Sequence, residues 1–209
     1  MIFKDMIFIK VSLEQMYKPQ VNGFRDETLP EFNPILFSST FKNEQKRKEA
    51  DIEYIKSYLE SAKILVDETY KRQICANGIK KIFYNYSLEL PTIYMCRHCL
   101  ELSIKHAINK LGKEAKNTHG LEGQWNAFMQ YISKDMISGK ERTILKNMGE
   151  FIRNIDGLDD NGTKLRYPLQ EDKSFSQGEF LWVNTKQIVK STEDFVNQME
   201  AFIYREYSK

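Results

Sequence analysis

The sequence predicts an all-α fold, an antiparallel helical bundle of four to five helices preceded by a packed, irregular N-terminal arm. Apolar residues recur at steps of three and four after residue 43, which is the pattern of helices with one buried face. Glycine or proline falls between most of these periodic segments, where helices end or begin. Residues 1–43 have no sustained helical period and hold three of the five prolines. We therefore expect an arm over 1–43 and one helical domain over 44–209.

Composition limits the class of protein but does not name a function. The 209 residues suit one domain with a substantial core, and the 31 basic and 29 acidic residues leave a net charge of only +2. Any nucleic-acid contact must therefore come from a local cluster. The apolar opening is interrupted by Lys4, Asp5 and Lys10, so we expect neither a signal peptide nor a membrane span. The expected location is cytoplasmic.

The first predicted helix starts at Asn43, runs for about thirty residues and is closed by Gly78. Its packed face repeats at steps of three and four residues and comprises Ile52, Ile55, Leu59, Ala62, Val66 and Tyr70. A further helical piece is predicted over 79–87.

The central helix begins near Pro91, which suits a first helical turn, and ends at Gly112. Its apolar face comprises Ile93, Cys96, Leu100, Ile104, Ala107, Ile108 and Leu111. Arg97 falls within that face. A buried guanidinium cannot lose its charge, so it must meet a carboxylate or several acceptors, and Glu101 at i+4 is the nearest supplier. Lys105, a further four residues along, extends the row towards solvent.

Two more helices and a loop are predicted before the last helix. Thr118 is expected to cap a helix over 119–133, and the next helix is expected over 140–155. An aspartate- and glycine-rich loop follows, in which Arg166 and Tyr167 are expected in extended chain because Pro168 comes next. A short strand over 178–183 and a terminal helix over 185–204 complete the chain.

The row Arg97, Glu101, Lys105 in an apolar helix resembles the core helix of HEPN-domain proteins (higher eukaryotes and prokaryotes nucleotide-binding). The stretch Thr118-His119-Gly120-Leu121 is similar to that family's Thr-His-Asp-Leu at the start of the next helix, with glycine in place of the acid. The segment 165–168, Leu-Arg-Tyr-Pro, resembles the Arg-Tyr-Pro segment of some members. The resemblance covers about residues 79–204 and implies a HEPN-like bundle.

The resemblance also implies chemistry, since many HEPN proteins are metal-independent endoribonucleases with an arginine four to six residues before a histidine. No such pair occurs in this chain. RNA cleavage nevertheless needs only a proton acceptor, a donor and positive charge beside the phosphate. The catalytic candidates are His119, Arg97 and Arg166, with His98 as an alternative base. The alternative for Arg97, Glu101 and His119 is a structural polar network that joins two helices.

Arg166 and Tyr167 are the predicted ligand contacts, with Lys105, because a guanidinium beside a phenol suits a phosphate and a stacked base. We predict no metal site, since Cys96, Cys99, His98 and His106 cannot converge from one helix. No cofactor is predicted either. The three cysteines lie in predicted helices, which favours a reducing compartment.

The sequence leaves three functional hypotheses open. The first is a HEPN-like protein of a prokaryotic antiviral defence or toxin-antitoxin system that binds RNA or a nucleotide and cleaves RNA. The second is a non-catalytic HEPN module that binds a protein partner from the same system, and the third is an unrelated all-α scaffold. A homodimer is expected because the last helix carries Phe195, Phe202 and Tyr204, more apolar surface than one packed face needs.

Overall fold

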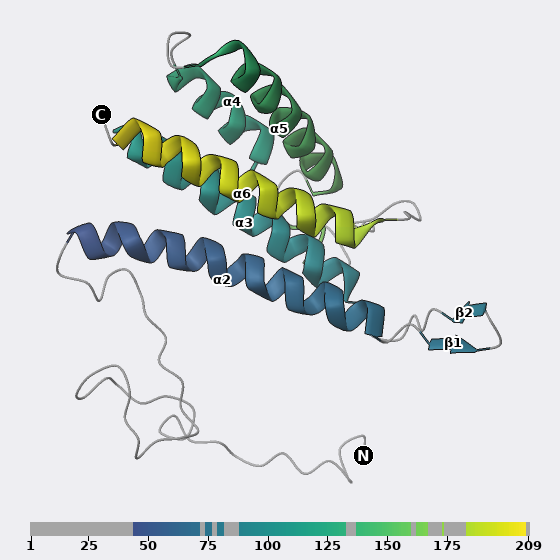
Figure 1. Cartoon of the computed structure of the whole chain (residues 1–209). Helices are drawn as coiled ribbons and strands as arrows, with labels where there is room; N and C mark the ends of the chain where they lie inside the picture. The colour runs from purple at the N-terminus through teal and green to yellow at the C-terminus, as the bar shows by residue number, and fades with distance from the viewer. Residues whose placement is uncertain are drawn as a thin grey trace, which may run out of the picture.

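The computed structural model describes residues 44–71, 74–76, 79–81, 88–132, 137–159, 162–166, 173 and 183–207. Within these ranges the protein is helical apart from one two-stranded hairpin (Figure 1). The predicted arm and all but the last residue of the predicted strand lie outside them. The elements are α2 (Glu44–Lys71), β1 (Ile74–Ala76), β2 (Ile79–Lys81), α3 (Glu89–Lys110), α4 (Leu121–Tyr131), α5 (Gly139–Leu158) and α6 (Thr185–Tyr207).

Helix α3 lies at the centre of the bundle. It packs against α2, α4 and α6, and α2 runs antiparallel to α3 and α6 (Figure 1). The predicted face of α2 is the one that packs, with Ile55, Leu59, Ala62 and Val66 all buried. They meet Cys96 and Cys99 of α3 and Val189 and Val196 of α6 in two small apolar clusters.

A larger core joins α3 to the antiparallel pair α4 and α5 and to α6. Trp125 of α4 lies within it, with its ring centroid 5.3 Å from that of Phe128 and 5.6 Å from that of Phe195. Leu100, Ile104 and other apolar residues of the predicted α3 face complete it. The helices foreseen from periodicity are thus the ones that build the core.

The segment after α2 differs from the prediction. Helix α2 ends at Lys71, and Ile79–Lys81 forms a strand paired antiparallel with Ile74–Ala76. The helix closed by Gly78 and the helical start predicted at residue 79 are therefore wrong, and residues 82–87 of that predicted piece lie outside the described residues. Cys75 consequently lies in a strand. The sequence between the strands is Asn-Gly, a strong hairpin signal because both residues tolerate positive φ. That local preference prevails over the helical pattern.

The start of α4 also differs, because Gly120 and not Thr118 occupies the N-cap. Gly120 makes no side-chain cap, and the first free amide, that of Leu121, donates to the Asp156 carboxylate at 2.8 Å. Thr118 instead offers its backbone carbonyl to the Gln124 amide. The cap of α4 is therefore supplied from the end of α5 rather than by a neighbour in sequence.

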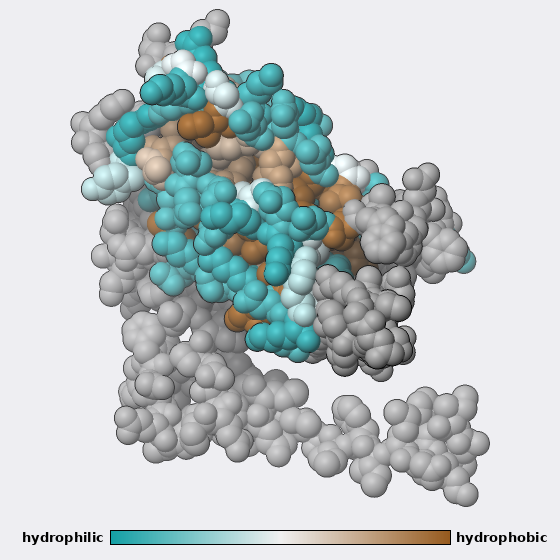
Figure 2. Space-filling view, turned by 45° about the vertical axis from the view of Figure 1, so that its right-hand side comes forward, coloured by the Kyte–Doolittle hydropathy of each residue, from teal (hydrophilic) through white to brown (hydrophobic). Residues whose placement is uncertain are grey.

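The aromatic residues of α6 are divided between core and surface. Phe195 is buried, Phe202 is half-buried and Tyr204 is 78% exposed, so Phe195 adds no surface for a dimer. An apolar groove of about 230 Å³ lies between α5 and α6, and the Glu141–Arg205 ion pair joins its two sides. Figure 2 shows apolar surface between hydrophilic stretches on this face. No described helix is long and apolar enough to cross a membrane.

We predict that Gly149→Ala will destabilise the protein by about 1–3 kcal/mol, although alanine favours helices. A Cβ at residue 149 would lie 2.7 Å from the indole nitrogen of Trp125, inside the main core. Gly157→Ala on the same helix is the matched control, because its Cβ meets nothing within 4 Å. Urea denaturation checks both variants. Equal stability of the two would contradict the packing of α4 on α5.

Candidate functional site

The site is built around Arg97, whose side chain is 2% exposed. Its Nε donates to the backbone carbonyl of Asp159 at 2.9 Å and lies 3.5 Å from the carboxylate of the same residue. One terminal nitrogen donates to Glu101 at 3.2 Å, and the other donates to the backbone carbonyl of His119. The guanidinium thus joins α3 to the loop before α4 and to the turn after α5. The predicted pairing of Arg97 with Glu101 is present.

Glu101 joins the other side chains of the site to Arg97. Its side chain is 3% exposed, and its carboxylate contacts Arg97, Lys105 and His119. Oε2 accepts from Arg97, while Oε1 accepts from Lys105 Nζ at 2.8 Å and lies 3.0 Å from His119 Nδ1. Burial alone would raise the pKa of Glu101. The hydrogen bonds and charges of Lys105 and His119 outweigh burial and hold this pKa below its usual value, so Glu101 is an anion at neutral pH.

His119 is the exposed member of this group, with 65% of its side chain accessible. A proton on Nδ1 that is donated to the Glu101 carboxylate fixes the tautomer and leaves Nε2 as a proton acceptor. Lys105 Nζ bonds to the same carboxylate oxygen, so a cation lies next to the imidazole. The arrangement is that of an oriented general base beside a positive charge.

The turn after α5 fits closely around Arg97. Asp159 is fully buried, and its carboxylate accepts from the backbone N–H of Lys164 at 2.9 Å. Gly162 has φ of +76°, and a Cβ there would lie 3.0 Å from a terminal nitrogen of Arg97. Both the left-handed conformation and the close approach require glycine at this position. The turn is shaped by the buried guanidinium.

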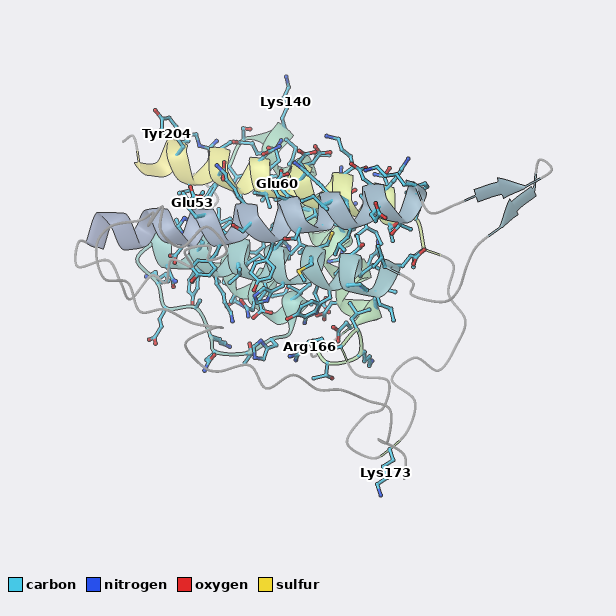
Figure 3. All side chains as sticks on the ribbon, turned by 90° about the horizontal axis from the view of Figure 1, so that it is seen from below. Glu53, Glu60, Lys140, Arg166, Lys173 and Tyr204 are labelled. Carbon is cyan, nitrogen blue, oxygen red and sulfur yellow. The ribbon has the colours of Figure 1, made fainter. Side chains whose placement is uncertain are left out.

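Arg166 lies at the end of the same turn, beside α3 on the side away from α6 (Figure 3). Its Nε donates to the Gly162 carbonyl at 2.6 Å, and its own N–H donates to Thr163 at 3.0 Å. The segment is therefore a turn and not the predicted extended chain. The steric rule constrains the residue directly before a proline, which is Tyr167. Tyr167 falls outside the residues that the structure describes.

A row of rings continues from Arg166 along α3. The guanidinium carbon is 5.8 Å from the centroid of the Tyr94 ring, which stacks on His98 at 6.0 Å and 11°. His98 meets Tyr58 of α2 edge to face at 4.4 Å. Burial lowers the pKa of His98, so its imidazole is neutral at physiological pH. Rings beside a cation suit a base and its phosphate.

Five of the six predicted site residues belong to one connected set. Arg97, Glu101, Lys105 and His119 share one hydrogen-bonded network, and Arg166 reaches it through Gly162. Sequence reasoning missed Asp159 and Gly162 as partners of Arg97. The aspartate run that contains Asp159 was visible, but nothing in a sequence shows which of its members turns towards the core.

No three His, Cys, Asp or Glu side chains among the described residues are arranged to hold a metal ion. Cys96 and Cys99 are buried, and burial raises their thiol pKa values to about 11 and about 12. They are therefore neutral thiols within the packing of α3.

Comparison of the chain with models of known protein families, with curated proteins and with solved structures finds no match.

We predict that Glu101 makes stability sensitive to acid. The pKa of Glu101 is lower in the folded state than in the unfolded state, where it is about 4.3. The ionised carboxylate therefore stabilises the fold fully above the unfolded pKa. This stabilisation is lost as the pH falls through the folded pKa. Glu101→Gln should therefore be less stable at pH 7 and show a shallower loss between about pH 5 and pH 3. Urea denaturation at each pH measures it.

Glu114→Gln is the control for this series, because Glu114 is exposed in the loop before α4. It should keep the parent's acid dependence. If the free energy of unfolding depends on pH in the same way in the parent and in Glu101→Gln, the ion pairs of Glu101 are contradicted.

Proposed function

We propose that this is a HEPN-like protein of a prokaryotic defence or toxin-antitoxin type that binds RNA and cleaves it without a metal. The observation that carries the proposal is the pair of hydrogen bonds to Glu101 Oε1. They place the oriented imidazole of His119 beside the ammonium of Lys105, with the imidazole open to solvent. The HEPN resemblance of the motifs supports the same substrate class.

In the proposed reaction, His119 Nε2 takes the proton of a ribose 2′-hydroxyl. The 2′-oxygen then bonds to phosphorus, the bond to the 5′-oxygen breaks, and that oxygen takes a proton from water. Lys105 stabilises the charge that develops on the phosphate oxygens. Arg166 binds a neighbouring phosphate beside the Tyr94 ring.

Arg97 takes a positioning role in this proposal. It is buried, and its nitrogens are directed at Asp159, Glu101 and His119 rather than at solvent. It holds Glu101 in the orientation that His119 and Lys105 need. It does not touch the substrate.

The non-catalytic HEPN module is the second candidate, and one observation favours it. Every terminal nitrogen of Arg97 has a protein acceptor, as a purely structural network requires. In either case the apolar groove between α5 and α6 is the surface that we assign to a second copy or to a protein partner.

The test of cleavage uses a single-stranded RNA labelled at both ends and the variant His119→Asn. The asparagine amide can replace Nδ1 as the donor to Glu101, but it lacks a base at the position of Nε2. Cleavage should fall by at least about 100-fold, with RNA affinity retained. Cleavage at the parent rate would exclude His119 as the base.

Binding is tested with Arg166→Gln, which removes the charge and keeps a donor for the Gly162 carbonyl. The RNA affinity should fall, and the slope of log affinity against log salt should shrink by about 1. Arg153→Gln, at an exposed position of α5, is the control and should bind as the parent does. The contrary result is a parent protein that binds no RNA at low salt and forms a stable complex with another protein of the defence or toxin-antitoxin system. That result would favour the non-catalytic HEPN module.

A further inference from the structure

A recess of about 230 Å³ lies between α4 and α5, which run side by side (Figure 1). Trp125 and Met129 of α4 line it together with Gly149 of α5. The recess is separate from the groove between α5 and α6, although Ile137 and Leu145 line both. A Cβ at residue 149 would lie 2.7 Å from the indole nitrogen of Trp125. Because glycine has no side chain, the surface of α5 is open beside the indole.

Three basic side chains border this recess, those of Arg142, Lys146 and Arg153. With Gly149 they recur at steps of four, three and four residues, so all four positions fall within an arc of about 60° on α5. The three cations are exposed, and none forms an ion pair or a hydrogen bond with the described residues. Glu150 is turned about 100° from Gly149 and does not line the recess. The positive charge of this face is therefore not compensated within the described part of the chain.

The indole of Trp125 is the feature of the recess that points to an acceptor. Its Nε1 is the ring atom nearest to residue 149, with Cδ1 and Cε2 both 3.5 Å from the position of a Cβ, so the nitrogen edge of the ring faces the recess. The N–H has no acceptor among the described residues. A largely buried indole N–H usually has a hydrogen-bond partner. An oxygen of a bound molecule would supply one.

Size and shape decide which kind of molecule fits. The recess is smaller than the roughly 300–1,000 Å³ of small-molecule sites, but it can hold one apolar side chain against Met129, Ile137 and Leu145. Trp125 presents its edge, so it offers no ring face on which a base could stack. Arginine pairs well with carboxylates, often through two parallel hydrogen bonds. An apolar anchor flanked by carboxylates is the chemistry of an acidic protein segment.

We propose that the recess between α4 and α5 docks an acidic segment of a partner protein. One apolar side chain enters the recess, a backbone carbonyl accepts from Trp125, and carboxylates pair with Arg142, Lys146 and Arg153. The inference goes beyond the proposed function and does not depend on it, because no RNA contact proposed above lies on this face.

The spacing of the cations defines a peptide that should bind. At about 1.5 Å per residue, Lys146 and Arg153 lie about 4.5 and 6 Å along the helix from Gly149, on opposite sides of it, and Arg142 lies about 10.5 Å away. An extended chain advances about 3.3 Å per residue and returns to the same side every second residue. Acidic residues two positions before and after the anchor, and four positions before it, therefore match the row. The peptide Glu-Ser-Glu-Ser-Leu-Ser-Glu, blocked at both ends, has this pattern.

The test follows the Trp125 indole N–H signal by NMR of the full chain during titration with this peptide. The chain has two tryptophans, so Trp182→Phe assigns the signal. The peptide should shift the signal and bind at least about tenfold more tightly than one with glutamine for glutamate, and than one with alanine for leucine. Equal affinity of the three peptides, or no shift at millimolar peptide, would overturn the proposal.

Paired substitutions locate the site. Arg142→Gln combined with Lys146→Gln should weaken peptide binding at least about tenfold and leave urea denaturation unchanged, since both positions are exposed. Lys71→Gln combined with Lys116→Gln removes the same charge from exposed positions elsewhere and should bind the peptide as the parent does. Equal weakening in the two double variants would show only a general charge effect and would contradict the site.

RNA is the competing occupant of a basic face, and the same signal separates it from a protein. Single-stranded RNA should leave the Trp125 signal in place, and Arg142→Gln with Lys146→Gln should keep the RNA affinity of the parent. RNA that shifts this signal, or loses affinity in that double variant, would overturn the proposal. Failure of the proposed nuclease is recognised separately, because it shows in the cleavage assay and does not change peptide binding.

Discussion

The structure depends on one buried charge. Arg97 lies on the face of α3 that packs, and the guanidinium cannot be neutralised, so every neighbouring segment must offer it an acceptor. Asp159 and the carbonyl of His119 do so from two loops that are distant in sequence. Gly162 then follows with the positive φ that brings the turn against the guanidinium. The charge therefore determines the path of the chain at both ends of the α4–α5 pair.

The same charge prepares the chemistry that we propose. A carboxylate in the core would normally be protonated more readily, but Glu101 is held as an anion by its cationic neighbours. The anion in turn orients His119 at the surface and Lys105 beside it. Positive charge, a base and a row of rings thus occupy neighbouring positions along one helix. The near-neutral net charge of the chain is consistent with a local site of this kind.

Periodicity was sufficient to place α2, α3, α4, α5 and α6, because each buries one apolar face on the others, but it wrongly predicted helix where the hairpin lies. The i to i+4 spacing of Arg97 and Glu101 was likewise enough to predict their contact. Partners contributed by loops could not be predicted, since the role of Asp159 depends on how the chain turns after α5. Two local sequence signals, one for a turn and one for a helix start, were present but did not enter the prediction. Asn-Gly after Ala76 marks the hairpin, and Ser138 with Glu141 forms the capping box that starts α5.

Amide hydrogen exchange in Arg97→Met tests whether Arg97 holds the loops before α4 and after α5. Methionine fills similar space without charge, and the reference is the interior of α2 in the same sample. We expect the amides of Leu121, Lys164 and Arg166 to lose protection relative to α2, because the acceptors that face Arg97 lose their donor. A uniform change across α2 and these loops, or unchanged protection of the three amides, would contradict it.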